Sequence, residues 1–432
     1  MLTSEGTHRR PIRMLVAVLA VVLVFAAGAC RDDDDDDAGD NGGGGTAGEP
    51  ATTAGFDGET ITLGVITPQT TTAAIIGNPL TNGNQTYFDA VNADGGIAGK
   101  YQVELEVRDS QYSPDVAAQA YGELREQVVL FQQILGTAIT NAVLTDLEDD
   151  NLMAAPASLD AEWVRNPSLI PVGGPYQIQA INALDYWTRN GAPDDATLCV
   201  MRQDDLYGEA SFEGIEVASE AFGFEIGVDT QFAPTATEFT AQLQEIRGGD
   251  CDAVYLVSLP THALAIFNEA VAAGYENRWI GQAPTWVSLL AQGDVGAYTQ
   301  ENFWVASEGT QWGDTEVEGM AQMIADQEEF APDQEPDIYF AFGYAQAWTV
   351  AQILEKAVEL GDLSPDGIKT AVEEVGTVSL GNLLGDYTYG APDDRVPPKT
   401  STIFAVDPQI PGALQALEVN FTSETAEEFD DF

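Results

Sequence analysis

The chain has 432 residues and a formal net charge of −54, from 16 basic and 70 acidic side chains, for which a saline habitat is one explanation. Nucleic acid is a poor partner for such a chain, because neutralising phosphate groups requires a basic patch. Hydrophobic residues make up 44 % of the sequence, so most of the chain can fold. The chain is longer than most domains that are built around a single hydrophobic core.

The N-terminal segment predicts an export signal. A basic stretch, 8–13, precedes an apolar run, 14–27, that is shorter than the about 20 residues of a membrane-spanning helix. Residues 1–29 are therefore expected to be a signal peptide that is removed. The small residues before Cys30 resemble a bacterial lipoprotein signal, in which that cysteine carries lipid, although Ala27 stands where leucine is usual. The cleavage site of an ordinary secreted protein is the alternative.

The cysteine count agrees with lipid on Cys30. Three cysteines in an exported protein leave one to explain, and lipidation accounts for it. Cys199 and Cys251 both lie beside predicted strands. They form either a disulfide or two small buried hydrophobic side chains, because the sequence does not supply the Cα separation that a bridge requires.

Residues 30–58 predict a flexible acidic and glycine-rich tether. The six aspartates 32–37 lack the spaced ligands of a calcium loop and are typical of a solvated, extended segment, so we expect no metal. The stretch 43–48 matches the glycine pattern of a dinucleotide-binding motif, but no predicted strand precedes it and no predicted helix follows it. We therefore expect a linker and no cofactor.

From residue 59 onward, strand and helix patterns alternate. Apolar residues at every second position predict the first two strands, and Ser113 followed by Pro114 predicts the start of a helix. Alternation of this kind indicates a parallel sheet covered by helices on both faces. The expected strands are 61–65, 101–107, 128–135 and 152–155.

The pattern restarts after the glycine and proline residues 173–175. Thr235 and Glu238 have the spacing of a capping box and predict the start of one of the helices. Three later helices come without obvious strands between them, which suggests a return to the first lobe. The expected elements are helices 176–190, 208–222 and 261–273, strands 197–202, 224–230, 252–258 and 279–281, and the later helices 315–327, 337–359 and 365–374.

These patterns predict two α/β lobes with a cleft between them. We expect lobe 1 to comprise 59–175 plus about 308–388. Lobe 2 would comprise about 176–307 plus 389–420, followed by an acidic tail, 421–432. A ligand would bind at the carboxyl ends of the strands, where the cleft opens.

Few residues in the sequence suit catalysis. Of the two histidines, His8 leaves with the signal, and His262 lies at a predicted helix start, where a solvated or capping role is expected. The sequence lacks a nucleophile elbow, a Cys-x-x-Cys pair and a zinc-protease motif. We therefore predict a binding protein rather than an enzyme; a secreted hydrolase would need a cluster of titratable groups in the cleft.

Three strand ends carry the candidate binding residues. The segment 136–141 follows a buried strand and opens a helix, so its backbone N–H groups and threonine hydroxyls suit a carboxylate. An ordinary glycine turn with threonine caps is the alternative. Ala157 and Ser158 end the next strand at the same edge of the sheet. Tyr207 follows the first strand of the second lobe and offers both area and a hydroxyl.

The order and spacing of these stretches resemble the substrate-binding proteins of ABC importers, in the branched-chain amino acid and amide branch (Leu/Ile/Val-binding-protein-like). The resemblance covers about 61–407. It implies a periplasmic-binding-protein type I fold: α/β, two lobes that are each a doubly wound, mostly parallel sheet, and a hinge of several crossings that closes on a small ligand. The matching stretches are 61–65, 93–99, Asp109 with 113–114, 204–208 and 270–274.

The resemblance also implies the ligand-binding positions. The carboxylate site falls on Gly136 or Thr137, with Thr140 if the turn is longer. The second anchor falls on Ala157 and Ser158, and the two aromatic contacts on Tyr207 and Tyr339. Further candidates for selecting the ligand are Gln69, Thr71 and Trp286.

Two positions depart from the amino-acid binders. Ala283 stands where an acid would pair with the ligand ammonium, and Leu259 replaces a second tyrosine. A buried ammonium without an anionic partner is costly, so either another acid compensates or the ligand is not an α-amino acid. Amides and organic acids become plausible ligands.

Together these expectations describe a monomeric solute receptor held by lipid on Cys30 at the outer face of a bacterial membrane. It would capture a small solute that is amino-acid-, amide- or organic-acid-like and deliver it to an ABC permease and its ATPase. A sensor that passes its closed state to a signalling partner is the alternative.

Overall fold

The computed structural model describes residues 48–432; Cys30, the signal peptide and most of the tether lie outside the described residues. No helix within 48–432 is long and apolar enough to span a membrane. The strands are β1 Thr60–Thr67, β2 Gln102–Asp109, β3 Phe131–Leu135, β4 Ala154–Ala157, β5 Thr197–Gln203, β6 Glu225–Phe232, β7 Ala253–Val257, β8 Arg278–Gln282, β9 Phe303–Ser307, β10 Thr377–Val378, β11 Tyr387–Thr388, β12 Ser401–Val406 and β13 Leu414–Phe421. The α-helices are α1 Ala74–Ala93, α2 Pro114–Leu124, α3 Thr137–Asp149, α4 Tyr176–Asn190, α5 Leu206–Phe222, α6 Thr240–Gly249, α7 Pro260–Ala273, α8 Gly293–Asn302, α9 Glu318–Phe330, α10 Ile338–Leu360, α11 Pro365–Glu374 and α12 Glu424–Glu428.

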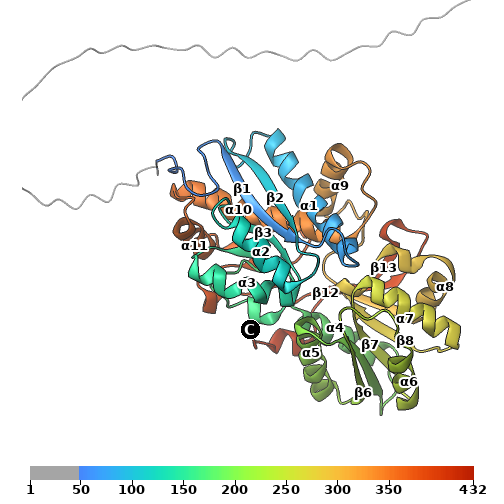
Figure 1. Ribbon diagram of the computed structural model, residues 1–432. Coiled ribbons are helices and arrows are strands. Elements are labelled where there is room, and N and C mark those ends of the chain that lie inside the picture. The colour runs from blue at the N-terminus through green and yellow to red at the C-terminus, as the bar shows by residue number, and fades with distance from the viewer. Residues whose placement is uncertain (1–47) are drawn as a thin grey trace, which may run out of the picture. The chain divides into compact units, whose positions relative to one another are not determined.

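The first lobe is a four-stranded parallel sheet in the order β2-β1-β3-β4. Residues of α2 and α3 share one core with this sheet, and residues of α1, α9, α10 and α11 share the other, so helices cover both faces. The late helices, orange in Figure 1, thus return to the first lobe beside the blue helix α1, as predicted.

The second lobe is a seven-stranded sheet in the order β13-β12-β9-β8-β7-β5-β6. The five strands from β6 to β9 are parallel, and β12 and β13 extend the sheet in antiparallel fashion. Helices α4 and α5 belong to one core of this lobe, and α6, α7 and α8 to the other (Figure 1). The predicted α/β, two-lobed fold with mostly parallel sheets is confirmed.

The chain crosses between the lobes three times: after β4, after β9, and before β12. The three crossings meet at Gly174, where a Cβ atom would lie 2.3 Å from Glu308 Oε1 and 2.9 Å from the carbonyl oxygen of Pro398. This close approach explains why glycine occupies the position. The hinge therefore has several crossings, whereas the lobe boundaries drawn from the sequence remain a prediction.

The predicted capping box at Thr235 and Glu238 is wrong. Helix α6 begins at Thr240, and its first groups are capped from another helix. Glu269 of α7 accepts hydrogen bonds from the backbone nitrogen of Phe239 at 2.9 Å and from Thr240 Oγ1 at 2.7 Å. A tertiary contact with a residue thirty positions away therefore replaces the local motif.

Both ends of the described chain pack against the fold. Phe56, within the predicted tether, is only 2 % exposed, and its ring lies 5.1 Å from that of Tyr101. In the predicted acidic tail, Ser423 donates from its backbone nitrogen to Asn182 Oδ1 at 2.9 Å, and α12 follows it. Buried apolar residues within these stretches, Phe56 and Ala426, explain both differences, because they gain free energy by burial.

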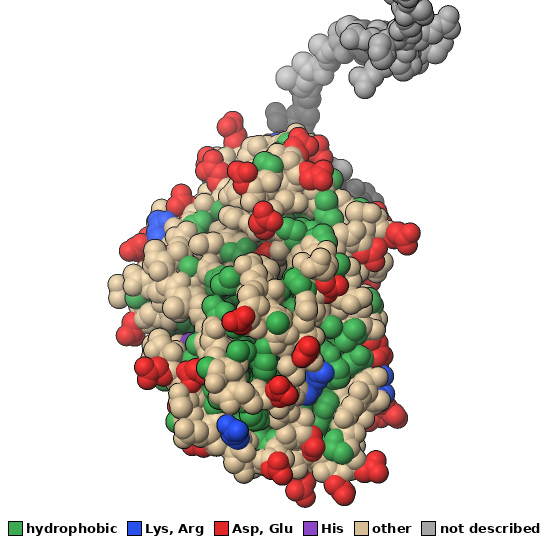
Figure 2. All heavy atoms as spheres, turned by 90° about the vertical axis from the view of Figure 1, so that its right-hand side faces the viewer, with side chains coloured by type: hydrophobic (Ala, Val, Ile, Leu, Met, Phe, Trp, Pro, Cys, Tyr) green, Lys and Arg blue, Asp and Glu red, His purple; other side chains and the backbone are tan. Residues whose placement is uncertain are grey.

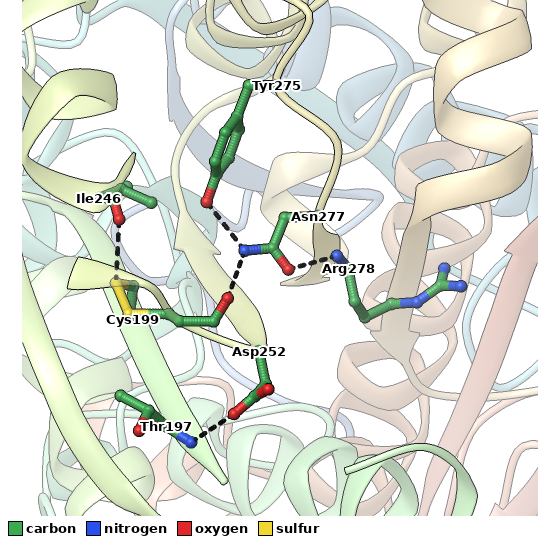
Figure 3. Close-up of a disulfide and its surroundings, with 8 residues drawn as sticks. Thr197, Cys199, Ile246, Asp252, Tyr275, Asn277 and Arg278 are labelled. Atoms are coloured by element: carbon green, nitrogen blue, oxygen red, sulfur yellow. Dashed lines mark hydrogen bonds between the residues drawn. A yellow bond between two sulfur atoms is a disulfide. The ribbon is translucent and has the colours of Figure 1, made fainter. Parts of the chain in front are cut away.

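Cys199 and Cys251 form a disulfide, the alternative that the sequence left open. Their Cα atoms are 5.7 Å apart, because Cys199 lies in β5 and Cys251 lies two residues before the neighbouring strand β7. Asn277 supports the site, donating to the carbonyl oxygen of Cys251 and to Tyr275 Oη, each at 2.8 Å (Figure 3). The bond thus ties two adjacent strands of the second lobe.

Acidic side chains dominate the ionisable surface. Figure 2 shows them spread over the visible face, with only a few Lys and Arg residues among them. On this face the negative charge is therefore distributed over the surface and does not mark one patch.

Candidate functional site

A cavity of about 120 Å³ lies between the two lobes. This volume accommodates several atoms of a ligand, since one water needs only about 10–15 Å³ on the same measure. Apolar side chains form most of its wall, among them Ile76, Leu80, Leu135, Leu159, Leu259, Met320, Phe342, Leu383, Leu384, Phe404 and Leu414. Polar side chains contribute at a smaller number of positions, namely Tyr112, Thr137, Ser158, Tyr176, Gln179, Tyr207, Ser307, Glu308, Thr310, Asp337 and Tyr339.

The turn between β3 and α3 forms one end of the cavity, here called the cleft end. Gly136 has φ 110°, a conformation that favours glycine, and a Cβ atom there would lie 2.9 Å from the ring of Tyr112. Thr137, the first residue of α3, is 1 % exposed. Its Oγ1 is buried and makes no hydrogen bond to any described residue, and the first N–H groups of α3 point the same way along the helix. Hydrogen-bond donors are thus concentrated at this end.

Ser158 adds another donor beside Thr137. It follows β4, the neighbour of β3 in the sheet, and its Oγ accepts a hydrogen bond from Trp163 Nε1 at 3.0 Å. Because the indole already donates to this oxygen, the serine hydroxyl hydrogen is free to point elsewhere.

Tyr207 lines the cavity from the second lobe. It is 3 % exposed, and its ring lies 4.8 Å from that of Tyr176. Burial raises the pKa of Tyr207 well above its usual value, so the phenol stays protonated. Its hydroxyl is buried without a hydrogen-bond partner among the described residues, so its proton is available for donation.

Tyr339 joins the lobes across the cavity. It lies near the start of α10 in the first lobe, and its hydroxyl donates to carbonyl oxygens of the second lobe, at 2.6 Å from Trp286 O and 3.0 Å from Ala283 O. Leu259 of the second lobe packs in the same apolar cluster as Tyr339 and Leu80. The lobes are therefore in contact around the cavity.

Two carboxyl groups with raised pKa values also line the cavity. Burial raises the pKa of Glu308, at the hinge, to about 8. Burial also raises the pKa of Asp337 to about 6, while hydrogen bonds from the backbone nitrogens of Tyr339 and Phe340, at 2.7 and 3.2 Å, oppose that shift. Asp337 thus serves as the N-cap of α10.

Seven of the sequence candidates do line this cavity. They come from both lobes and from five separate segments of the chain, so the fold brings together candidate residues that are far apart in the sequence. Whether they contact a ligand stays a prediction. They are Gly136, Thr137, Ala157, Ser158, Tyr207, Ala283 and Tyr339.

Four candidates do not line the cavity. Thr140 faces its own sheet, and its hydroxyl lies 3.4 Å from the carbonyl oxygen of Ile134. Gln69 and Thr71 lie in the first loop, where Asp109 accepts the backbone N–H of Gln69 at 2.9 Å. Trp286 belongs to a core of the second lobe and contributes its carbonyl oxygen to Tyr339 rather than its ring to the cavity.

His262 is buried, in contrast to the expected solvated or capping role. It is 4 % exposed, its Nδ1 lies 3.1 Å from Gln203 Oε1, and burial lowers its pKa to about 4. It does not line the cavity. Among the described residues that do, none is His, Cys, Lys or Arg.

Sequence reasoning missed Tyr112, Tyr176, Gln179, Glu308 and Asp337. One available signal was Pro175, which ends a crossing and directly precedes α4, the helix that carries Tyr176 and Gln179. Glu308 lies among many acidic residues, so nothing local sets it apart.

Comparisons with known proteins agree with this architecture. The family model described as periplasmic binding protein matches residues 60–409. A Leu/Ile/Val-binding protein from Rhizobium johnstonii is 25 % identical over 201 residues, which are 45 % of this chain and 53 % of that protein. The chain thus spans about half the length of this curated relative.

Solved structures share the fold. A fatty acid ABC transporter substrate-binding protein from Thermomonospora curvata has a TM-score of 0.82 at 23 % identity, over 88 % of this chain and 97 % of that one. A branched chain amino acid ABC transporter from Thermus thermophilus with bound valine has a TM-score of 0.75 at 16 % identity, over 86 % of this chain and 98 % of that one. Because the family model covers most of its length, the chain belongs to the periplasmic binding protein family.

Proposed function

We propose that this protein is an extracytoplasmic solute receptor that captures an apolar organic acid between its lobes and delivers it to an ABC importer. One observation carries the proposal: the cavity between the lobes is mostly apolar and has a group of hydrogen-bond donors at its cleft end. Such a site suits a ligand with one acceptor group and an apolar body. No reaction is expected.

The cleft end would bind the carboxylate. Thr137, Ser158 and Tyr207 each have a hydroxyl hydrogen available, and the N-terminus of α3 adds backbone N–H groups. Hydrogen bonds to an ionised acceptor are stronger than neutral ones, so these groups can hold a carboxylate without a basic side chain.

An α-amino acid fits less well. Its ammonium needs an ionised carboxylate, and Ala283 cannot provide one. Asp337, whose pKa is raised to about 6, is ionised at neutral pH, but its Oδ1 already accepts the two backbone N–H groups that cap α10. Glu308 is protonated at neutral pH because burial raises its pKa to about 8. The apolar wall beyond the cleft end favours a longer hydrocarbon chain, as the name of the fatty-acid-binding neighbour also suggests.

The other parts of the proposal follow from the N-terminal sequence and the relatives. Lipid on Cys30 would hold the receptor at the outer face of the membrane, and the acidic tether would let it reach a permease. Replacing Cys30 with Ala should move the protein from the membrane fraction to the soluble fraction; continued membrane association would contradict the anchor.

A thermal-shift and calorimetry series tests the ligand class. Decanoate should raise the melting temperature of the protein, and leucine should not, because a ligand that binds only the native state stabilises it. Thr137→Val should weaken decanoate binding about tenfold, or about 1.4 kcal/mol. Thr140→Val is the matched control on the same helix, since its hydroxyl faces the sheet. Tight binding of leucine without binding of decanoate would refute the proposal.

A further inference from the structure

The cavity has a second polar region, at the hinge. Glu308 follows β9 at the second crossing, and Gln179 lies in α4 just after the first; both line the cavity. Both side chains bind the backbone of Gly174. Glu308 Oε1 accepts the N–H group of Gly174, and Gln179 Nε2 donates to its carbonyl oxygen at 3.0 Å. These two hydrogen bonds fix the orientation of both side chains.

Each of the two side chains keeps one free polar atom. Glu308 Oε2 and Gln179 Oε1 are buried and have no hydrogen-bond partner within residues 48–432. Burial raises the pKa of Glu308 to about 8, so the carboxyl group carries a proton at neutral pH. Because Oε1 already accepts a hydrogen bond, the proton belongs on Oε2. The hinge therefore presents one donor, at Glu308, and one acceptor, at Gln179.

Apolar side chains border this pair. A Cβ atom at Gly173 would lie 3.1 Å from Glu308 Oε2 and 3.3 Å from the ring of Phe342. A Cβ atom at Gly309, the residue after Glu308, would lie 3.3 Å from the side chain of Leu384. A buried donor and acceptor in such a wall are unfavourable unless a bound molecule satisfies both.

We propose that the ligand carries a hydroxyl group on its apolar chain, remote from the carboxylate, which accepts a hydrogen bond from Glu308 and donates one to Gln179. This inference rests on the proposed function, capture of an apolar acid with its carboxylate at the cleft end. A hydroxyl is the smallest organic group that both donates and accepts. A site built to bind a hydroxyl rejects the analogue that lacks it, because its own polar groups are then buried without partners.

Calorimetry on the wild-type protein tests the inference without any variant. Two series are titrated: unsubstituted alkanoates from hexanoate to tetradecanoate, and the ω-hydroxy acids of the same chain lengths. At the chain length that spans the cavity, the hydroxy acid should bind at least tenfold more tightly than its unsubstituted partner. If the unsubstituted acids bind and no hydroxy acid exceeds its partner, the hydroxyl site is refuted and the proposed function survives. If neither series binds, the proposed function fails.

Two variants then locate the preference. Glu308→Gln retains an acceptor for the Gly174 N–H group and a donor toward the cavity, so it should keep the preference for the hydroxy acid. Glu308→Met removes both groups, so the affinities for the two acids should converge. A preference that persists in Glu308→Met would show that the hydroxyl binds elsewhere and would overturn the assignment.

Discussion

The hydroxyl of Tyr339 is predicted to hold the two lobes together. It lies in the first lobe and donates to carbonyl oxygens of the second, 2.6 Å from Trp286 O and 3.0 Å from Ala283 O. When the lobes separate, water can replace this hydrogen bond on both sides. Tyr339→Phe removes the hydroxyl and little else, and therefore acts on the closed form alone.

The size of the effect follows from the burial of the contact. In the closed form of Tyr339→Phe, a buried carbonyl group loses its donor, which costs about 1–3 kcal/mol. In the open form the same carbonyl is hydrated and the cost vanishes. The equilibrium between the two forms should therefore shift toward the open form by about 5- to 150-fold. If the ligand binds only the closed form, and the open form dominates without ligand, the dissociation constant rises by the same factor.

Two measurements check this expectation. Small-angle X-ray scattering at a decanoate concentration that half-saturates the wild type should show a larger radius of gyration for Tyr339→Phe, and calorimetry with decanoate should show weaker binding. Tyr344→Phe is the matched control, because Tyr344 lies on the same helix and donates to Asp326 within the first lobe. The control should lower thermal stability and leave the affinity unchanged. Equal affinities for wild type and Tyr339→Phe would refute the reasoning.

Three further predictions concern stability, each measured by urea denaturation. Arg395→Met should lower the free energy of unfolding by about 3 kcal/mol or more, since the buried guanidinium donates to three carbonyl oxygens of the loop 164–169; a loss below about 1 kcal/mol would contradict this. Burial raises the pKa of Glu308 from 4.5 to about 8, so the stability that its protonated form provides is complete below pH 4.5 and is lost as the pH rises toward 8. Glu308→Gln should therefore stabilise the protein by about 3 kcal/mol at pH 7 and much less at pH 5, and a pH-independent difference would argue against the raised pKa. Replacing Cys199 and Cys251 together by Ala should cost about 4 kcal/mol, since the disulfide closes a loop of 52 residues, and reduced wild type should match the variant.

Much of the fold could be predicted because its strands have local patterns. Ile61, Leu63 and Val65 alternate along β1, and all three are fully buried. By contrast, β12 is a short apolar run whose antiparallel place beside β9 depends on the hinge, and no local pattern encodes that pairing. The predicted start of α6 was wrong for the same reason, because the residues that begin this helix are capped by Glu269 of another helix.

The two ends of the candidate site differ in the same way, because local sequence patterns predict one end and not the other. Thr137, Ser158 and Tyr207 lie within four residues of the ends of β3, β4 and β5, and strand ends can be found from sequence periodicity. The hinge end consists of Glu308 and Gln179, which lie 129 positions apart and meet only because two crossings both pass Gly174. A search by strand-end motifs therefore finds the groups to which the proposed function assigns the carboxylate. It overlooks the hinge pair, where a change of one side chain could alter ligand choice without altering the motifs that identify the family.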